Sequence, residues 1–115
     1  MSLRDRAISA ELKTGSVEVP QWGGTVGVRE MTVSQRVVFA ELWSKSQARA
    51  LVQLLIDNTF DPDTGKAILE RTDRDVLAEK GGKAVQICTD KIFSISGYTA
   101  DAAEDMEKNS KASAD

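Results

Sequence analysis

The sequence of 115 residues predicts a small α+β domain, mostly α, in which an N-terminal β-hairpin packs on a bundle of four to five helices. Three observations support this prediction. Apolar and polar residues alternate in two short runs around a Pro/Gly turn, apolar residues recur at helical spacing over most of the remaining chain, and two capping signatures mark helix starts. A chain of this length forms one compact domain. We place that domain at residues 1–98 and expect an acidic C-terminal segment at 99–115.

The first predicted elements are a short helix and the hairpin. Four apolar residues at helical spacing predict an amphipathic helix within residues 3–12: Leu3, Ala7, Ile8 and Leu12. The hairpin is expected over residues 16–30, because Pro20 cannot continue a strand ladder and the pair Gly23-Gly24 supplies a turn. Four valines are expected on one face of the hairpin: Val17, Val19, Val26 and Val28. Since an isolated two-stranded hairpin is marginally stable in water, this face must pack on helices or pair with another chain.

A long helical region follows over residues 32–57. Thr32 and Gln35 have the spacing of a capping box at its start. Residues 48–56 are apolar on more than one face, which indicates a central, buried helix. The polar stretch at 44–46 leaves open whether the region is one helix or two.

The next part of the chain is expected to turn and then to form a short helix. The sequence Asp-Pro-Asp-Thr-Gly at 61–65 consists of residues that favour turns, and a brief extended segment is expected at 66–71. Thr72, with the carboxylate of Asp75 three residues later, predicts a helix over 72–80. The Gly81-Gly82 pair is expected to end this helix.

The last predicted core helix spans residues 83–96 and is closed by Gly97. Its expected buried face is formed by Ala84, Cys88, Ile92 and Ile95, flanked by Val85 and Phe93. Residues 99–115 contain two lysines and five carboxylates, so the whole net charge of −3 lies in this segment and the body is neutral. The segment has Met106 as its only large apolar residue, so a helix capped by Thr99 is expected to fray into a disordered acidic tail.

The composition excludes several kinds of chemistry. The chain has no histidine, which removes Ser-His, Cys-His and His-metal sites. A single cysteine can form neither an internal disulfide nor a Cys-rich zinc site. The negative charge argues against binding to nucleic acid. The longest apolar run is far shorter than a membrane span, and the N-terminus lacks a signal-peptide core. We therefore expect no cofactor, no membrane or nucleic-acid partner, and a location in the cytoplasm.

The patterns that could carry catalytic or metal chemistry have simpler interpretations. The turn at 61–65 lacks the oxygen ligands of a calcium loop, and the glycines near the hairpin do not match a dinucleotide-binding motif. Cys88 has no partner base and is expected to be a small buried apolar residue. The carboxylates at 73, 75 and 79 lie near a helix start, where capping and the helix dipole explain them. The sequence therefore predicts a protein that is not an enzyme.

Two tryptophans are candidates for contact with a partner, because tryptophan is enriched in binding hot spots. Trp22 lies in the hairpin turn, whereas Trp43 lies at the weak point of the long helical region and can equally be a packing residue. Together with the valine face of the hairpin, they form the predicted surface for a partner or for self-association: Val17, Val19, Trp22, Val26, Val28 and Trp43.

The order of these motifs resembles the tail assembly chaperones of long-tailed bacteriophages with flexible tails. The resemblance begins at Met1-Ser2-Leu3-Arg4-Asp5 and continues through Val17-Glu18-Val19-Pro20-Gln21-Trp22-Gly23 and Val26-Gly27-Val28-Arg29-Glu30-Met31-Thr32. The Leu/Val-rich helix, the turn at 61–65 and the capped helix at Thr72 follow in the order expected for the family. The sequence Ser96-Gly97-Tyr98-Thr99 and the acidic run after it resemble the family's C-terminal end.

The resemblance implies a role without catalysis. Such chaperones coat the aggregation-prone tape measure protein in the host cytoplasm while tail-tube subunits polymerise around it, and they are absent from the finished virion. In many members a −1 ribosomal frameshift produces a longer form that recruits the tail tube protein, and Glu107-Lys108-Asn109 is compatible with a slippery codon pair. We expect this chain to form homo-oligomers through the hairpin and the neighbouring apolar helix surface.

Two other classes of protein remain as alternatives. The first is a virion structural protein, such as a tail completion or head-tail connector subunit. The second is a regulatory or toxin-antitoxin binding module, which would have a basic DNA-reading surface or a toxin partner.

Overall fold

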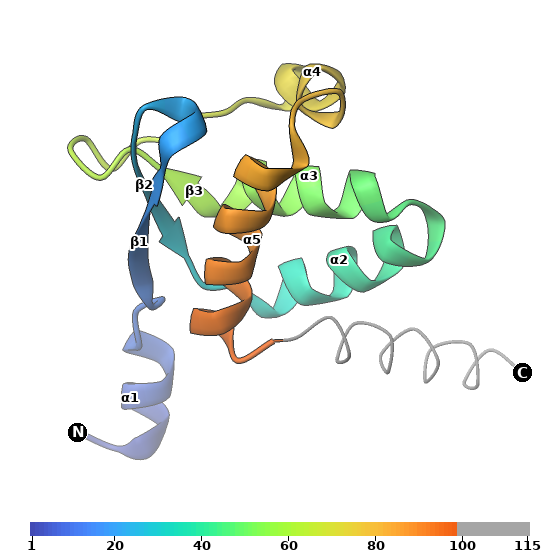
Figure 1. Cartoon of the computed structure of the whole chain (residues 1–115). Helices are drawn as coiled ribbons and strands as arrows, with labels where there is room; N and C mark the ends of the chain where they lie inside the picture. The colour runs from blue at the N-terminus through green and yellow to red at the C-terminus, as the bar shows by residue number, and fades with distance from the viewer. Residues whose placement is uncertain (99–115) are drawn as a thin grey trace, which may run out of the picture.

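The computed structural model describes residues 1–98 as five α-helices, two 3-10 turns and a three-stranded sheet (Figure 1). The elements are α1 (Leu3–Ser9), β1 (Thr14–Val19), η1 (Pro20–Trp22), β2 (Gly24–Arg29), α2 (Val33–Lys45), α3 (Gln47–Asn58), β3 (Thr59–Phe60), η2 (Arg71–Asp73), α4 (Arg74–Ala78) and α5 (Gly82–Ser96). This arrangement confirms the predicted mostly-α α+β fold. The predicted helix and acidic tail at 99–115 lie outside the described residues.

The predicted hairpin is present as two antiparallel strands, with Val17 paired opposite Val26. The 3-10 turn η1 joins the strands, and Gly23 closes it with a φ of 68°. The structure adds the short strand β3 on the other edge of β2, in the order β1-β2-β3. Two residues are too few to show an alternating pattern, so the sequence did not predict this strand.

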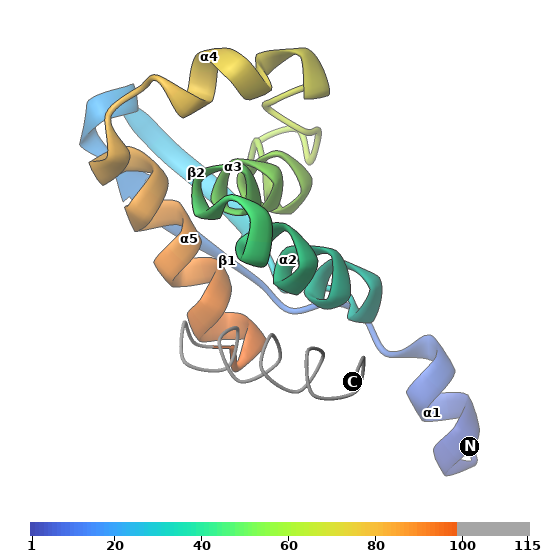
Figure 2. The ribbon, with the colours of Figure 1, turned by 90° about the vertical axis from the view of Figure 1, so that its right-hand side faces the viewer.

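The hairpin packs on helix α5, which runs alongside β1 and β2 in both views (Figure 2). Val19 and Val28 have no exposed surface, and Val26 is 6% exposed. On α5, Cys88 and Ile92 are fully buried in the same core. The hairpin therefore packs on helices, with Val19, Val26 and Val28 as core residues and Val17 half-buried against them.

The long helical region at 32–57 consists of two helices, α2 and α3, which lie side by side and run in opposite directions (Figures 1 and 2). Ser46 separates them in an extended conformation. Its Oγ accepts a hydrogen bond from Arg49 N, so one serine both ends α2 and caps α3. The capping box at the start of α2 is confirmed, because Gln35 N donates to Thr32 Oγ1 (3.1 Å) and Thr32 N donates to Gln35 Oε1 (2.9 Å).

The turn at 61–65 is confirmed, whereas the helix predicted after it needs correction. Gly65 has a φ of 74°, and its N–H donates to Asp61 O at 2.7 Å. Residues 66–70 form neither helix nor strand, and Glu70 has an extended backbone. The predicted helix at 72–80 is preceded by the 3-10 turn η2, and its α-helical part is only Arg74–Ala78. The cap is also different, because Glu70 N donates to Asp73 Oδ2 (2.8 Å). The carboxylate of Asp73 can satisfy this backbone group directly, so the helical turn begins before Thr72.

Helix α1 occupies the predicted position but does not contribute to the core. It ends at Ser9, and none of its residues is buried. In both views it extends away from the rest of the domain at the open end of the hairpin (Figures 1 and 2). Within residues 1–98, no helix is long and apolar enough to cross a membrane.

Candidate protein-binding surfaces

The structure places the six predicted contact residues in different environments. Val19, Val26 and Val28 are buried, and Val17 is half-buried against the same core. In this fold Val19, Val26 and Val28 are enclosed within the single chain, so of the predicted association residues only Val17, Trp22 and Trp43 have accessible surface. Trp43 is half-buried and packs on Phe39, with ring centroids 5.5 Å apart. Only Trp22, at the hairpin tip, is exposed.

Trp22 lines a hollow between the hairpin tip, the segment before η2 and helices α4 and α5. We call it the hairpin-tip groove. It has a volume of about 550 Å³, and its lining residues are Gln21, Trp22, Ile68, Leu69, Asp73, Val76, Leu77, Lys80, Gly81, Lys83 and Ala84. Three of its apolar side chains are exposed: Trp22 and Ile68 at 38% each and Val76 at 57%. Such a cluster of apolar groups around a hollow is typical of a protein-interaction site.

A second hollow, of about 410 Å³, lies between α2, α3 and α4, and we call it the α2–α3 cleft. Its lining is both apolar and charged. The apolar part comes from Val38, Phe39, Leu42, Ala50 and Leu54. The charged part consists of three arginines and a single carboxylate: Arg49, Arg71, Arg74 and Asp57. The lining therefore has an excess of positive charge beside an apolar floor.

Hydrogen bonds hold the polar side of the cleft together. Arg74 Nη2 donates to Gln53 Oε1 (2.7 Å), and Gln53 Nε2 donates to both carboxylate oxygens of Asp57 (3.1 and 3.0 Å). This network links α4 to α3. Asn58, which is 1% exposed, donates from Nδ2 to Arg29 O and Glu30 O (both 3.1 Å). Within residues 1–98, Arg74 Nε and Asn58 Oδ1 are buried without a hydrogen-bond partner.

Two titratable side chains, Cys88 and Tyr98, are buried in the core. Burial raises the pKa of the Cys88 thiol from 9.0 to about 11, so the reactive thiolate is disfavoured. This confirms the prediction that Cys88 is a buried apolar residue. Burial also raises the pKa of Tyr98, against the opposing effect of the Arg36 guanidinium, which lies 5.3 Å from the ring centre. Among the described residues, no cluster of three metal-binding side chains is present.

The sequence did not reveal most residues of the two hollows. Ile68 and Val76 stand in apolar runs of only three residues, 67–69 and 76–78, which are too short to show which side chain is left exposed. Only the fold places both residues in the same hollow as Trp22, which lies more than forty residues earlier in the chain. For the cleft, the sequence contains one weak indication of a basic surface: Arg71 and Arg74 are three residues apart, which places them on one side of a helical turn.

The comparisons with known proteins bear on the fold as a whole. No family model matches the sequence, and no curated protein matches it. Among solved structures, the chain shares its fold with a bacteriophage tail assembly chaperone. That structure is the tail assembly chaperone of bacteriophage HK97, which superposes with a TM-score of 0.60 and 22% sequence identity over 78% of this chain and 89% of the other. The resemblance stated from the sequence is thus confirmed at the level of the fold.

Proposed function

We propose that this chain is a phage tail assembly chaperone that binds the tape measure protein and keeps it soluble while the tail is assembled. One observation carries the proposal: the shared fold covers most of both chains, although only 22% of the aligned residues are identical. The order of sequence motifs supports the same family independently. On this proposal the chain acts without catalysis in the host cytoplasm and is absent from the finished virion.

The α2–α3 cleft is the surface that we assign to the tape measure protein. Val38 of α2, which belongs to this apolar lining, is 45% exposed. A client helix with an apolar face can bind such a surface in the helix-in-groove mode. Because Arg49, Arg71 and Arg74 outnumber Asp57, the bound client segment should carry acidic residues beside its apolar face.

The central experiment co-expresses the chain with the adjacent tape measure reading frame and measures how much tape measure protein stays in the supernatant. We expect a large gain in solubility with the unchanged chain. No gain would contradict the proposed function.

Two matched variants of α2 then test the surface. Val38→Asp places a charge in the cleft and should abolish the gain. Val33→Asp, also on α2, is a control, because Val33 is 81% exposed and lies outside the cleft lining. An acidic residue in the first turn of a helix is also favourable for the helix dipole. Equal loss in both variants would contradict the assignment to the cleft.

Two further measurements separate this proposal from its alternatives. Mass spectrometry of purified particles should not detect the chain, and its presence there would favour a virion structural protein. The possible frameshift-extended form, which would recruit the tail tube protein, requires a slippery codon pair at Lys108-Asn109. A Lys108 codon other than AAA would contradict that part of the proposal.

A further inference from the structure

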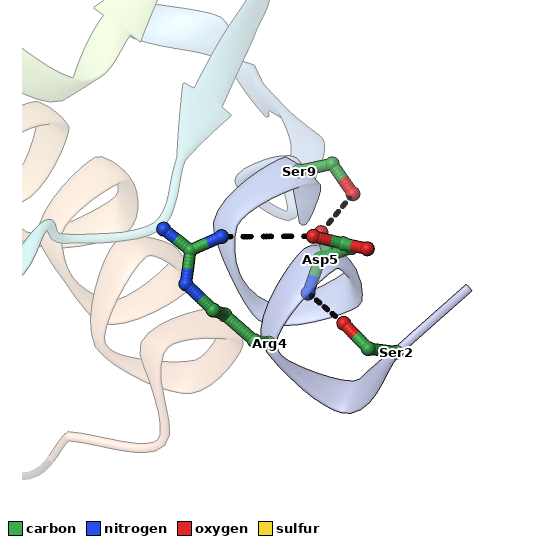
Figure 3. Close-up of polar contacts among 4 residues, drawn as sticks. All are labelled: Ser2, Arg4, Asp5 and Ser9. Atoms are coloured by element: carbon green, nitrogen blue, oxygen red, sulfur yellow. Dashed lines mark hydrogen bonds and ion pairs between the residues drawn. The ribbon is translucent and has the colours of Figure 1, made fainter.

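The three arginines of the α2–α3 cleft have no acidic partner within residues 1–98. The ion pair that the structure shows in this range lies within helix α1, where Arg4 Nη1 is 3.6 Å from Asp5 Oδ1 (Figure 3). Asp57, the carboxylate in the cleft lining, accepts hydrogen bonds from a glutamine instead. Two of the arginines, Arg49 and Arg71, are exposed. The positive charge of the cleft is therefore not neutralised by residues 1–98, and the acidic groups of a ligand can reach it.

The acidic segment at residues 99–115 has a sequence pattern that complements the cleft. Met106 is its only large apolar residue, and three carboxylates lie within two positions of it: Glu104, Asp105 and Glu107. The cleft has the reverse arrangement, with an apolar floor beside three arginines. The segment has a formal net charge of −3, and the cleft lining, with three arginines and one carboxylate, has an excess of positive charge. Shape and charge therefore favour the same pairing, with the apolar residue on the floor and the carboxylates beside the arginines.

The described part of the chain ends beside the cleft. Tyr98 is 2% exposed and packs on Phe39 of α2, with ring centroids 5.8 Å apart. The Arg36 guanidinium lies 5.3 Å from the centre of the same tyrosine ring. Phe39 also belongs to the lining of the cleft. The residues that follow Tyr98 therefore start from the part of α2 that forms the cleft floor.

The segment is long enough to reach the cleft from this starting point. A helix is about 10–12 Å in diameter, so a path halfway around α2 measures roughly 16–19 Å. The eight residues from Tyr98 to Met106 span up to about 26–29 Å when extended. A segment tethered in this way has an effective concentration in the millimolar range at its site. The tether therefore favours the chain's own segment over a free acidic partner of equal affinity.

We propose that residues 104–107 bind in the α2–α3 cleft of their own chain, with Met106 on the apolar floor and the adjoining carboxylates beside the arginines. The segment then occupies the surface assigned above to the tape measure protein, and a client must displace it before binding. Only this consequence rests on the proposed function. The contact itself is a property of the single chain and is tested without a client.

The tether also sets the size of the competition. If the isolated segment binds with a Kd of about 0.1 mM, a millimolar effective concentration fills the cleft in about nine of ten chains. A competing ligand then binds about 10-fold more weakly than it would bind an empty cleft. A weak, solitary acidic peptide is excluded by a restraint of this size, whereas a long client that makes many contacts overcomes it.

The first test locates the segment in the full chain with a spin label. Ser110→Cys places a new thiol three residues after Glu107, and Cys88 is buried, so the label reacts at the new position. Amide NMR signals close to the label are broadened. We expect broadening at Arg49 and Arg74, on two sides of the cleft, and the same broadening after dilution. Broadening confined to other surfaces would overturn the inference, and its loss on dilution would show that a second copy supplies the segment.

Charge reversal then tests whether the arginines hold the segment. The cleft variant Arg49→Glu/Arg71→Glu should remove the broadening on α3 and α4. The matched control Arg4→Glu/Arg6→Glu makes the same change in net charge on α1 and should retain it. Circular dichroism confirms that both variants are folded. Equal loss in the two variants would show an effect of net charge alone and would overturn the assignment.

The reversed pair provides a rescue. The segment variant Glu104→Lys/Asp105→Lys/Glu107→Lys should lose the contact in the unchanged cleft. Combined with the cleft variant, it should regain the contact, because opposite charges again face each other. A combined variant without the contact would contradict the pairing.

A second test measures competition with a defined probe, a fluorescent peptide of residues 99–110. The neutral-segment variant Glu104→Gln/Met106→Ser/Glu107→Gln leaves the cleft empty. It should therefore bind the peptide about 10-fold more tightly than the unchanged chain does, as measured by fluorescence anisotropy. Val38→Asp places a charge in the cleft and should abolish peptide binding. Equal affinity of the unchanged chain and the neutral-segment variant would overturn the inference.

Failure of this inference and failure of the proposed function are distinguishable. If the chain solubilises the tape measure protein but the spin label does not reach the cleft, only the inference is wrong. If the segment binds the cleft and neither the unchanged chain nor the neutral-segment variant solubilises the tape measure protein, only the proposed function is wrong.

Discussion

The buried face and the tip of the same hairpin show how one element serves two purposes. On the face, Val19 and Val28 are completely enclosed beneath α5. At the tip, Trp22 and its neighbours Ile68 and Val76 stay exposed around a hollow. Apolar residues of similar character therefore stabilise the fold at one end and are available for binding at the other. The difference is decided by whether a helix of the same chain covers them.

The largest expected effect on stability is at the buried face. Val28→Ala removes two methyl groups from a site with no exposed surface, and the cavity should cost about 3 kcal/mol of the free energy of unfolding. Denaturant titration followed by circular dichroism measures this change. A loss below about 1 kcal/mol would show that the face is loosely packed and would weaken the contrast with the tip.

The buried core also predicts a pH dependence above neutrality. The pKa of Cys88 is raised from 9.0 to about 11, so the unfolded chain loses this proton first as pH rises. The folded state then binds more protons than the unfolded state, and stability falls between about pH 9 and 11. Two pKa units correspond to about 2.7 kcal/mol, which is an upper bound for this group.

Cys88→Ala is the matched control for this pH effect, because it removes the titrating group. Its free energy of unfolding should fall less steeply over the same interval, and the difference between the two slopes isolates the thiol. Parallel slopes would contradict the effect. At neutral pH, labelling of the thiol should require unfolding.

A smaller effect is expected where the hairpin meets β3. Gly27 pairs with Phe60, and a Cβ at position 27 would lie 2.5 Å from Phe60 Cε2. Gly27→Ala should therefore destabilise the domain by about 1–2 kcal/mol through overpacking. Phe60→Ala removes the side chain with which the new Cβ would clash. Gly27→Ala should therefore lower the free energy of unfolding less in the Phe60→Ala background than in the unchanged chain. Thermal unfolding of the four proteins in this cycle tests the coupling.

The smallest stability effect is expected at the tip. Trp22→Ala should lower the free energy of unfolding by about 1 kcal/mol, because part of the indole is already exposed. Denaturant titration followed by circular dichroism measures this change in the same way as for Val28→Ala. If Trp22→Ala destabilises the domain as much as Val28→Ala, Trp22 is a core residue and the hairpin tip does not differ from the buried face.

Some elements could be predicted because their signal is local. The capping box of Thr32 and Gln35, the turn closed by Gly65 and the helix end at Gly97 each depend on residues a few positions apart. The valine face was also predicted correctly as a face, because strand side chains alternate. Three of its four valines are enclosed by the chain itself, because periodicity shows that residues share a side but does not show what covers that side.

Other features could not be predicted because their partners are distant in the sequence. The strand β3 exists only through its pairing with β2. The cap at Glu70 depends on the side chain of Asp73 rather than on the expected Thr72. The two hollows combine residues from three or four segments each, so no short window of sequence contains either one.

The sequence by itself determined the mostly-α α+β fold, the hairpin and the order of motifs that resembles a tail assembly chaperone. These follow from local propensity, capping and periodicity, which act between near neighbours in the chain. Only the tertiary structure decided that the hairpin valines are enclosed, that Trp22 meets Ile68 and Val76, and that α1 is left uncovered. The physical reason is that burial depends on the long-range packing of the whole chain, and burial separates a side chain that holds the domain together from one that can bind a partner.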